Sequence, residues 1–157
     1  MSEIKLSKTT EVDLHILFLF QLDAEANFMA AFTPECPLDL EAYLAKFGPF
    51  LKDPTIRNQT ILVDDVIVGS IAKFEMNGQA EITYWIDRAY WGRGIASRAL
   101  QQFLQIETMR PIHGAAAADN LGSRRVLEKC GFRYEGKGKG FAKYRGKEIE
   151  EVYYILD

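Results

Sequence analysis

Gly92 and Gly94 stand in the stretch Ala89–Leu100, AYWGRGIASRAL, directly before an apolar run with helical spacing. Glycine adopts backbone conformations that strain other residues, and it leaves no side chain in the way of a ligand. The backbone N–H groups of such a turn and of the helix start point in one direction, which suits a phosphate or a pyrophosphate. The stretch therefore predicts an anion site, and the alternative is a plain turn between a strand and a helix.

Two common phosphate motifs do not fit this turn. The chain contains no GxxxxGK[ST] string of a P-loop. A dinucleotide fingerprint needs an Asp or Glu about 20 residues further on, and this chain has His113 and Gly114 in that region. An acyl-CoA pyrophosphate loop is the third kind of site, while a nucleotide-binding module that uses the same turn stays open.

Two ordered motifs resemble the GNAT superfamily of acyl-CoA-dependent N-acyltransferases, and within it the RimJ/RimL-like branch. The first is Trp91-x-x-Gly94-x-Ala96, which is similar to motif A but has Trp91 where the family carries Gln or Arg. The second is ADNLGSRRVLEKCGFRYEG, in which these positions match the branch: Asn120, Ser123, Leu127, Lys129, Gly131, Phe132, Glu135 and Gly136. The resemblance covers residues 58–157 well and the first third by the order of its elements.

The resemblance implies an acetyl-CoA-dependent N-acetyltransferase that transfers the acetyl group directly to a primary amine, such as a protein N-terminus or a small amine. It implies that Asn120 hydrogen-bonds the pantetheine arm and that Ser123 protonates the leaving thiolate. Backbone N–H groups near Trp85 and Ile86 would polarise the thioester carbonyl. The residues expected to bind the cofactor are Trp85, Ile86, Gly92, Arg93, Gly94, Ile95, Ala96, Ser97, Asn120, Ser123 and Arg125, with Arg124 and Lys129 as further candidates for the 3′-phosphate.

Glu81 is the candidate catalytic base, with Ser123 as the candidate acid. An amine is mostly protonated at neutral pH, so its attack on a thioester requires the removal of a proton. Members of the family often place the carboxylate on the strand before the glycine turn, where Glu81 stands. Glu75 and Glu35 are rivals for this role, and an exposed acid on a half-buried strand is the simpler interpretation of Glu81.

Simpler interpretations also exist for the other candidates. Asn120 is a good N-cap for the helix that follows it, and Ser123 is equally well explained as an exposed hydroxyl in the first helical turn. Cys130 is most simply a small buried residue, because the resemblance implies direct transfer without an acyl-cysteine. The main alternative function is a non-catalytic domain that binds or senses acyl-CoA.

Composition limits the class of protein. A length of 157 residues fits one domain, residues 1–157, and 48% hydrophobic with 26% charged residues is typical of a globular protein. No apolar run approaches the roughly 20 residues that a membrane span needs. Two cysteines without a CxxC pattern and two histidines argue against a disulfide framework and a metal site. We therefore expect a cytoplasmic protein with no metal, no membrane contact and no nucleic-acid partner.

Charge is distributed unevenly along the chain. Residues 1–87 carry 6 basic and 14 acidic side chains, whereas residues 88–147 carry 13 basic and 4 acidic ones. The basic block surrounds the glycine turn, and its field can recruit an anion. We expect the acidic side chains of the first helices to line the acceptor side, which would suit a cationic amine: Asp13, Asp23, Glu25, Glu35, Asp39 and Glu41. A homodimer through sheet edges or terminal strands is also compatible with the sequence.

The order of elements predicts a mixed α/β (α+β) fold. Thr10 with Asp13 forms a capping-box pattern, and helical spacing follows to about Leu22. Asn77-Gly78 between two alternating runs indicates a hairpin, and Gly136–Gly140 reads as a flexible hairpin near the end of the chain. The resemblance implies a mostly antiparallel central sheet with helices on both faces.

Overall fold

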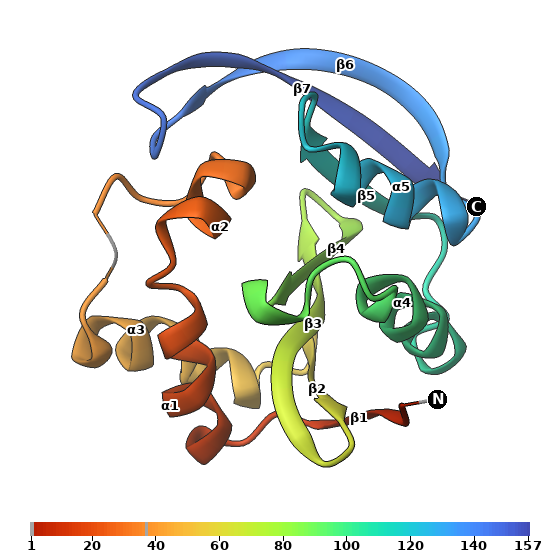
Figure 1. Ribbon diagram of the computed structural model, residues 1–157. Coiled ribbons are helices and arrows are strands. Elements are labelled where there is room, and N and C mark those ends of the chain that lie inside the picture. The colour runs from red at the N-terminus through yellow and green to blue at the C-terminus, as the bar shows by residue number, and fades with distance from the viewer. Residues whose placement is uncertain (1, 37) are drawn as a thin grey trace.

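The computed structural model describes residues 2–36 and 38–157. Figure 1 shows its strands in the middle of the molecule, with helices on both sides. The strands are β1 (Ile4–Lys8), β2 (Arg57–Val63), β3 (Val66–Met76), β4 (Gln79–Ile86), β5 (Ile112–Ala117), β6 (Arg133–Ala142) and β7 (Lys147–Leu156). The helices are α1 (Glu11–Phe20), α2 (Ala24–Ala30), α3 (Leu40–Phe47), α4 (Ile95–Ile106) and α5 (Leu121–Lys129), with short 3-10 turns η1 (Pro49–Lys52) and η2 (Arg88–Tyr90).

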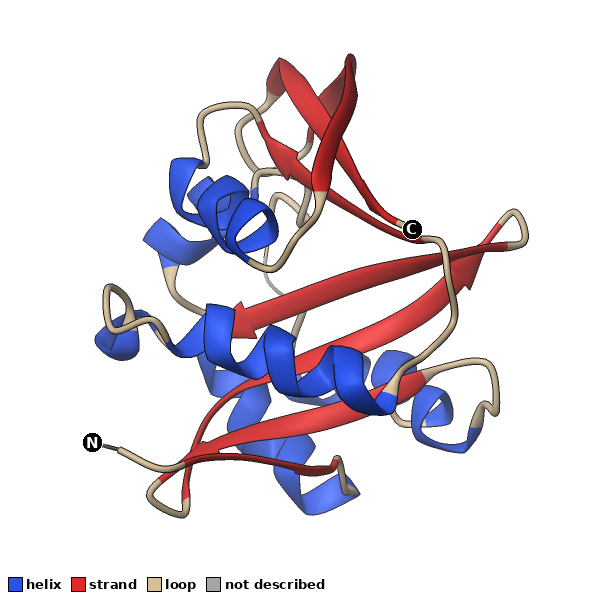
Figure 2. Ribbon diagram, turned by 90° about the vertical axis from the view of Figure 1, so that its right-hand side faces the viewer, coloured by secondary structure: helices blue, strands red, loops and turns tan. Residues whose placement is uncertain are grey.

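The strands of the described residues form one seven-stranded sheet in the order β1-β2-β3-β4-β5-β7-β6. Its pairings are antiparallel except for that between β4 and β5, which is parallel. The parallel pairing consists of Ala80 opposite Ile112 and Glu81 opposite His113, after which the strands separate. Figure 2 shows β5, β6 and β7 diverging from the other strands. The sheet therefore has a gap between β4 and β5 in its middle.

Both faces of the sheet carry hydrophobic clusters, which confirms the predicted fold class. On one face, α4 buries Leu100 and Phe103 and α5 buries Leu127 against the strands. On the other face, α1 and α3 bury Leu14 and Tyr43 in a separate cluster that includes residues of β3. Each large side chain buried in this way contributes roughly 1.5–3 kcal/mol to stability, so the helices that flank the gap are firmly held.

The first three helices begin at capping residues, of which Thr10 with Asp13 was predicted. Thr10 and Asp13 form a reciprocal capping box at the start of α1. Asp23 and Asp39 accept hydrogen bonds from the first-turn N–H groups of α2 and α3. These side-chain oxygens satisfy backbone donors that a helix start leaves without a partner. Three of the acidic residues expected on the acceptor side are thus engaged in helix caps.

The predicted hairpin at Gly136–Gly140 is wrong. These residues lie within β6, and the turn between β6 and β7 begins after Ala142. The glycines at alternate positions share one face of the strand, where a Cβ on Gly138 would come within 2.9 Å of the Tyr153 hydroxyl and one on Gly140 within 3.1 Å of the Phe32 ring. The glycines therefore make room for aromatic rings from β7 and from the loop after α2.

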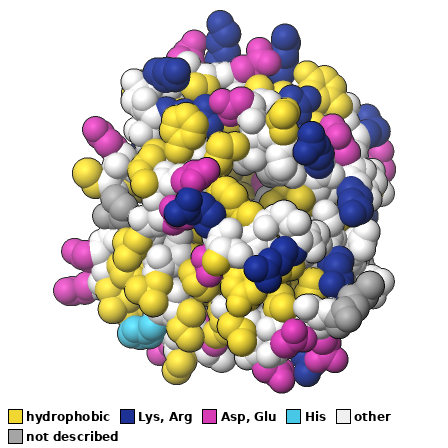
Figure 3. All heavy atoms as spheres, viewed as in Figure 1, with side chains coloured by type: hydrophobic (Ala, Val, Ile, Leu, Met, Phe, Trp, Pro, Cys, Tyr) yellow, Lys and Arg dark blue, Asp and Glu magenta, His cyan; other side chains and the backbone are white. Residues whose placement is uncertain are grey.

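Side chains of different kinds gather on different parts of the surface. In Figure 3, hydrophobic side chains cover the lower left, over α1 and α3, and Lys and Arg side chains lie along the upper and right edges. The right edge is that of α4 and α5, the two helices that flank the gap. No helix among residues 2–36 and 38–157 is both long and apolar enough to cross a bilayer.

Candidate active site

The gap between β4 and β5 exposes backbone groups in the middle of the sheet. The Asp87 N–H donates to the Val68 carbonyl at 2.8 Å, so residues 87 and 68 form a hydrogen-bonded antiparallel pair. Such pairs alternate along an antiparallel ladder, which directs the N–H of Trp85 to β3 and the N–H groups of Tyr84 and Ile86 to the gap. Of the two residues expected to polarise a carbonyl, Ile86 is therefore placed to donate into the gap through its backbone.

The glycine turn lies at the N-terminus of α4, beside the same gap. Gly92 and Gly94 have φ values of 76° and 73°, which other residues adopt only with strain. Gly94 is the N-cap of α4 and supplies no side-chain hydrogen bond to the first N–H groups of that helix. Those donors and the positive end of the helix dipole are open to an anion. The exposed Arg93 adds a positive charge there, and its guanidinium lies 5.0 Å from the Tyr90 ring.

Glu81 lies at the fork of the two strands. It is the last residue of β4 that pairs with β5, opposite His113. Burial raises the pKa of the Glu81 carboxyl, His113 lowers it, and Glu151 and Glu135 raise it further. His113 Nδ1 lies 3.6 Å from a Glu135 carboxylate oxygen. A carboxylate with a raised pKa is a stronger base, so its environment makes Glu81 a better proton acceptor than an ordinary carboxylate.

The rival carboxylates are placed differently. Glu75 forms a 2.7 Å ion pair with Lys73, which ties it to that lysine. Glu35 is exposed in the segment between α2 and α3. Neither residue lies at the fork, so the geometry favours Glu81 among the three candidates.

Ser123 lies in the first turn of α5 and contacts a residue of β4. Its Oγ is 2.8 Å from the Tyr84 hydroxyl, and its backbone carbonyl accepts a hydrogen bond from the same hydroxyl at 3.2 Å. Burial raises the pKa of Tyr84 to about 12, against the effect of the Ser123 hydrogen bond. Tyr84 is therefore a protonated phenol across the physiological range. Tyr84 was not singled out from the sequence, and this polar contact was missed.

Asn120 performs the capping role that its sequence position suggested. Its Oδ1 accepts from the Ser123 N–H at 3.2 Å, and its Nδ2 donates to the Met29 carbonyl at 3.3 Å. The first bond caps α5 and the second ties α5 to α2 across the gap. One hydrogen of the amide is left for a further acceptor, so capping and ligand binding are compatible.

The remaining basic candidates on α5 divide into two kinds. Arg124 donates to the Tyr154 hydroxyl and to the Ala118 carbonyl, so it serves the packing of α5 on the sheet. Arg125 and Lys129 are exposed, and no hydrogen bond or ion pair joins either side chain to another described residue of the chain. They are the two free cations on this helix.

Ser97 and Cys130 both point inward. Ser97 is buried on α4, and its carbonyl accepts a 3.4 Å hydrogen bond from the Cys130 thiol. Burial raises the pKa of the Cys130 thiol, which disfavours the reactive thiolate. Ser97 can therefore reach a ligand only through its backbone, and Cys130 serves to pack α4 against α5.

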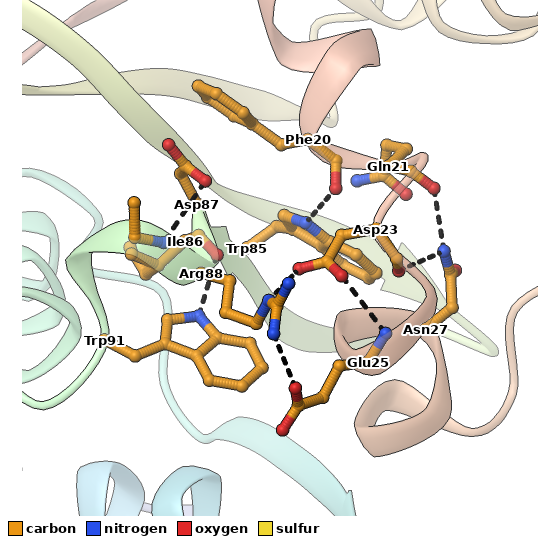
Figure 4. A network of polar contacts seen from close by, with 11 residues as sticks. Phe20, Gln21, Asp23, Glu25, Asn27, Trp85, Ile86, Asp87, Arg88 and Trp91 are labelled. Atoms are coloured by element: carbon orange, nitrogen blue, oxygen red, sulfur yellow. Dashed lines mark hydrogen bonds and ion pairs between the residues drawn. The ribbon is translucent and has the colours of Figure 1, made fainter.

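A network of polar contacts holds α1 and α2 over the end of β4 (Figure 4). Arg88 contacts Asp23 and Glu25 of the α2 region at 2.6 Å each. The indole N–H of Trp85 donates to the Phe20 carbonyl at the end of α1. Because side chains alternate along a strand, the face of β4 that bears Trp85 and Glu81 is the face toward α1 and α2. Tyr84 and Ser123 belong to the opposite face, toward α5.

A cavity lies away from this gap. It has a volume of about 410 Å³ and is lined by the start of β2, the end of β1 and residues near the end of α4. Most of its charged groups are paired: Arg57 with Glu107 at 3.1 Å, and Lys73 with Glu75 and with the Thr55 carbonyl. Lys8 also lines the cavity, and the Asn58 Nδ2 is a buried donor without a partner among the described residues. Because most of its charges are already neutralised, we do not assign the chemistry to this cavity.

Comparison with known proteins identifies the family of this chain. The sequence profile of the acetyltransferase (GNAT) domain matches residues 4–133. The chain belongs to the GNAT acetyltransferase family. The Bacillus subtilis protein YdaF is 34% identical over 104 residues, which are 61% of this chain and 56% of YdaF. The ribosomal-protein-serine acetyltransferase of Escherichia coli is 35% identical over 83 residues, which are 48% of this chain and 46% of that protein.

Solved structures show the same fold for this GNAT domain. RimL, a ribosomal L7/L12 alpha-N-protein acetyltransferase solved with coenzyme A, superimposes with a TM-score of 0.83 at 19% identity. The superposition covers 98% of this chain and 93% of that one. The curated relatives are matched over about half of their own length. The family and the RimJ/RimL-like branch predicted from the two motifs are confirmed.

Proposed function

We propose that this GNAT domain is an acetyl-CoA-dependent N-acetyltransferase that transfers the acetyl group directly to a primary amine. The observation that carries the proposal is the placement of Glu81 and Ser123 with respect to the gap. Glu81 lies at the fork on the side of α1 and α2, and Ser123 lies on the side of α5. A base on one side and a hydroxyl on the other are what direct transfer from a thioester within the gap requires.

The acyl donor would bind along the gap and the start of α4. Backbone N–H groups from Gly92 to Ser97 would hold the pyrophosphate, with Arg93 adding charge. The N–H of Ile86 would donate to the thioester carbonyl, and the free amide hydrogen of Asn120 would reach the pantetheine arm. The free cations Arg125 and Lys129 would face the 3′-phosphate. This assignment uses donors that the fold leaves without partners, and it is supported by relatives solved with CoA or acetyl-CoA.

The reaction then proceeds without a covalent enzyme intermediate. Glu81 removes a proton from the ammonium group, directly or through water, and the free amine attacks the acetyl carbon. The C–N bond forms, the C–S bond breaks with its electron pair going to sulfur, and the second proton leaves the nitrogen for water as the amide forms. Ser123 donates a hydrogen bond to the resulting thiolate. Both side chains thus act on charges that change during the reaction.

The acceptor is a primary amine with its positive charge near Glu81. Glu135 and Glu151 are close enough to raise the pKa of Glu81, and they add negative charge that favours a cation. A protein N-terminus and a small amine both fit this description. The name of the E. coli relative, a ribosomal-protein-serine acetyltransferase, supports a protein N-terminus.

Substitution of Glu81 by Gln tests the proposal. The variant should bind acetyl-CoA as the wild type does, measured by calorimetry, but its acetyl transfer to an amine panel should fall by roughly 10²–10⁴-fold. Glu35→Gln, an exposed carboxylate on the loop after α2, is the matched control and should keep full activity. Binding without transfer in the wild type would favour the acyl-CoA-sensing alternative. Absence of binding would contradict the proposal altogether.

The stability of the Glu81→Gln variant separates a lost base from a lost fold. The folded state raises the pKa of Glu81, so it binds that proton more tightly than the unfolded chain does. Stability therefore falls as pH rises through the interval between the ordinary and the raised pKa. Gln carries no charge to bury, so at neutral pH the variant should unfold at the wild-type temperature or above it.

The oligomeric state belongs to the same proposal. The sheet ends at β1 and β6, and an edge strand offers unpaired backbone groups to a second copy. We expect a homodimer through such an edge, and sedimentation of the purified protein would measure it. A location in the cytoplasm stays a prediction from the sequence.

A further inference from the structure

The hydroxyls of Tyr84 and Ser123 form a close pair that the sequence motifs do not include. Tyr84 comes from β4 and Ser123 from α5, and the two oxygens are 2.8 Å apart. Tyr84 packs partly buried against the main hydrophobic cluster, so its ring is held in place by the core. Its hydroxyl also reaches the Ser123 carbonyl at 3.2 Å. One rigid phenol therefore contacts both oxygen atoms of Ser123.

A phenol carries a single hydrogen, which allows two arrangements of this pair. In the first, Tyr84 donates to the Ser123 carbonyl and the Ser123 hydroxyl donates back to Tyr84. In the second, Tyr84 donates to Ser123 Oγ, and the serine hydrogen is free to point at a third atom. Only the second arrangement lets Ser123 donate to a group in the gap.

We propose that Tyr84 is a positioning residue that holds the Ser123 hydroxyl with its hydrogen directed at the sulfur of CoA. This inference rests on the proposed function, because it requires CoA in the gap. As the C–S bond breaks, the electron pair goes to sulfur, Ser123 donates a hydrogen bond to it, and Tyr84 donates one to Ser123 Oγ. No proton leaves Tyr84. The burial that raises its pKa to about 12 keeps it a donor throughout.

The pKa of the thiol of bound CoA reports whether Ser123 donates a hydrogen bond to the sulfur. This measurement needs no acceptor amine. A hydrogen bond to a charged acceptor stabilises the thiolate, so the wild type should lower the thiol pKa relative to a protein that lacks the donor. Ultraviolet difference absorbance of protein with and without CoA reports the thiolate. The subtraction removes Cys130, the titratable thiol near Tyr84, and the exposed Cys36.

A double-mutant cycle assigns the effect to the pair. Ser123→Ala and Tyr84→Phe should each raise the thiol pKa by about one pH unit, and the double variant should raise it no further. Tyr43→Phe is the matched control, because burial also raises the pKa of Tyr43 to about 12 but it lies on α3. Tyr43→Phe should leave the pKa of the CoA thiol unchanged.

The outcomes separate this inference from the proposed function. If CoA binds and Tyr84→Phe shifts the thiol pKa equally in the wild-type and Ser123→Ala backgrounds, Tyr84 does not act through Ser123 and the inference is wrong. An unshifted thiol pKa in both single variants also overturns it, while the proposed function stands. If calorimetry detects no binding of CoA by the wild type, the proposed function itself fails.

Discussion

Two regions of the central sheet, the cavity beside β1 and β2 and the gap between β4 and β5, differ in how their polar groups are satisfied. At the cavity, Arg57, Glu107, Lys73 and Glu75 line or border the space, and their charges neutralise one another. At the gap, by contrast, β4 lacks a partner on the side of β5 beyond Glu81, and α4 begins without a side-chain cap. One donor in the cavity, Asn58 Nδ2, also lacks a partner among the described residues, but the gap brings several free backbone donors together beside a helix N-terminus. The comparison teaches that such a group of donors marks a ligand site better than volume does, because a ligand supplies the partners that the fold withholds.

A substitution at Gly69 should have the largest effect, because it tests whether the gap end of β4 is rigidly held. Gly69 lies opposite Ile86, and a Cβ there would overlap the Trp85 carbonyl oxygen, which belongs to the backbone. Gly69→Ala should therefore cost roughly 2–4 kcal/mol and lower the melting temperature by roughly 5–15 °C in calorimetry.

Gly136→Ala is the control for this experiment. Gly136 is also a strand glycine, but a Cβ at its position would meet no heavy atom within 4 Å. Its melting temperature should stay close to that of the wild type. If the two variants lower the melting temperature equally, the loss of stability at Gly69 does not come from its close packing against β4.

Glu107→Gln should destabilise the protein and leave ligand binding intact. Burial alone would raise the pKa of Glu107, but the Met109 N–H, Arg57 and Lys73 outweigh it and hold the pKa below the ordinary value. The ionised form therefore stabilises the fold above the pKa of the unfolded chain, and this contribution is lost as pH falls through the lower folded pKa.

Loss of these charged hydrogen bonds should cost roughly 1–3 kcal/mol at pH 7, and the difference from the wild type should shrink in acid. Urea unfolding at several pH values measures this difference. Affinity for acetyl-CoA should be unchanged in calorimetry. A matching fall in affinity would mean that the region of the cavity contributes to the binding site.

Arg125→Ala should have the smallest effect, since the contact proposed for this exposed side chain would be screened by solvent. Affinity for CoA should fall by roughly 2- to 5-fold and affinity for 3′-dephospho-CoA should not change. Added salt should reduce the difference. Arg124→Ala, which removes bonds to Tyr154 and Ala118, should lower stability instead. Equal losses for the two cofactors would place Arg125 away from the 3′-phosphate.

Local sequence signals predicted most of the fold. The capping box at Thr10 and the positive-φ turn at Asn77-Gly78 lie where the sequence placed them. The extent of β6 was missed, because alternate glycines read as a flexible turn until Tyr153 and Phe32 are brought beside them from elsewhere in the chain. Contacts between distant segments of the chain therefore determine the length of β6.

The site was predictable to the extent that it consists of backbone and motif. Gly92 and Gly94 predicted the turn before α4, and Asn120 predicted the N-cap of α5. The hydroxyl pair of Tyr84 with Ser123 was not predictable, since it joins residues 39 positions apart from a strand and a helix. The free backbone donors of β4 also depend on the point at which β5 separates from β4. No single residue type predicts that point.

Hydrogen–deuterium exchange with and without acetyl-CoA tests the central claim most directly, because it reports on backbone N–H groups in both regions at once. We predict slower exchange in peptides that contain residues 84–86 and 92–97, with exchange at residues 54–59 unchanged. Protection of residues 54–59 with none at the glycine turn would contradict the account, because acetyl-CoA would then occupy the large cavity and not the gap.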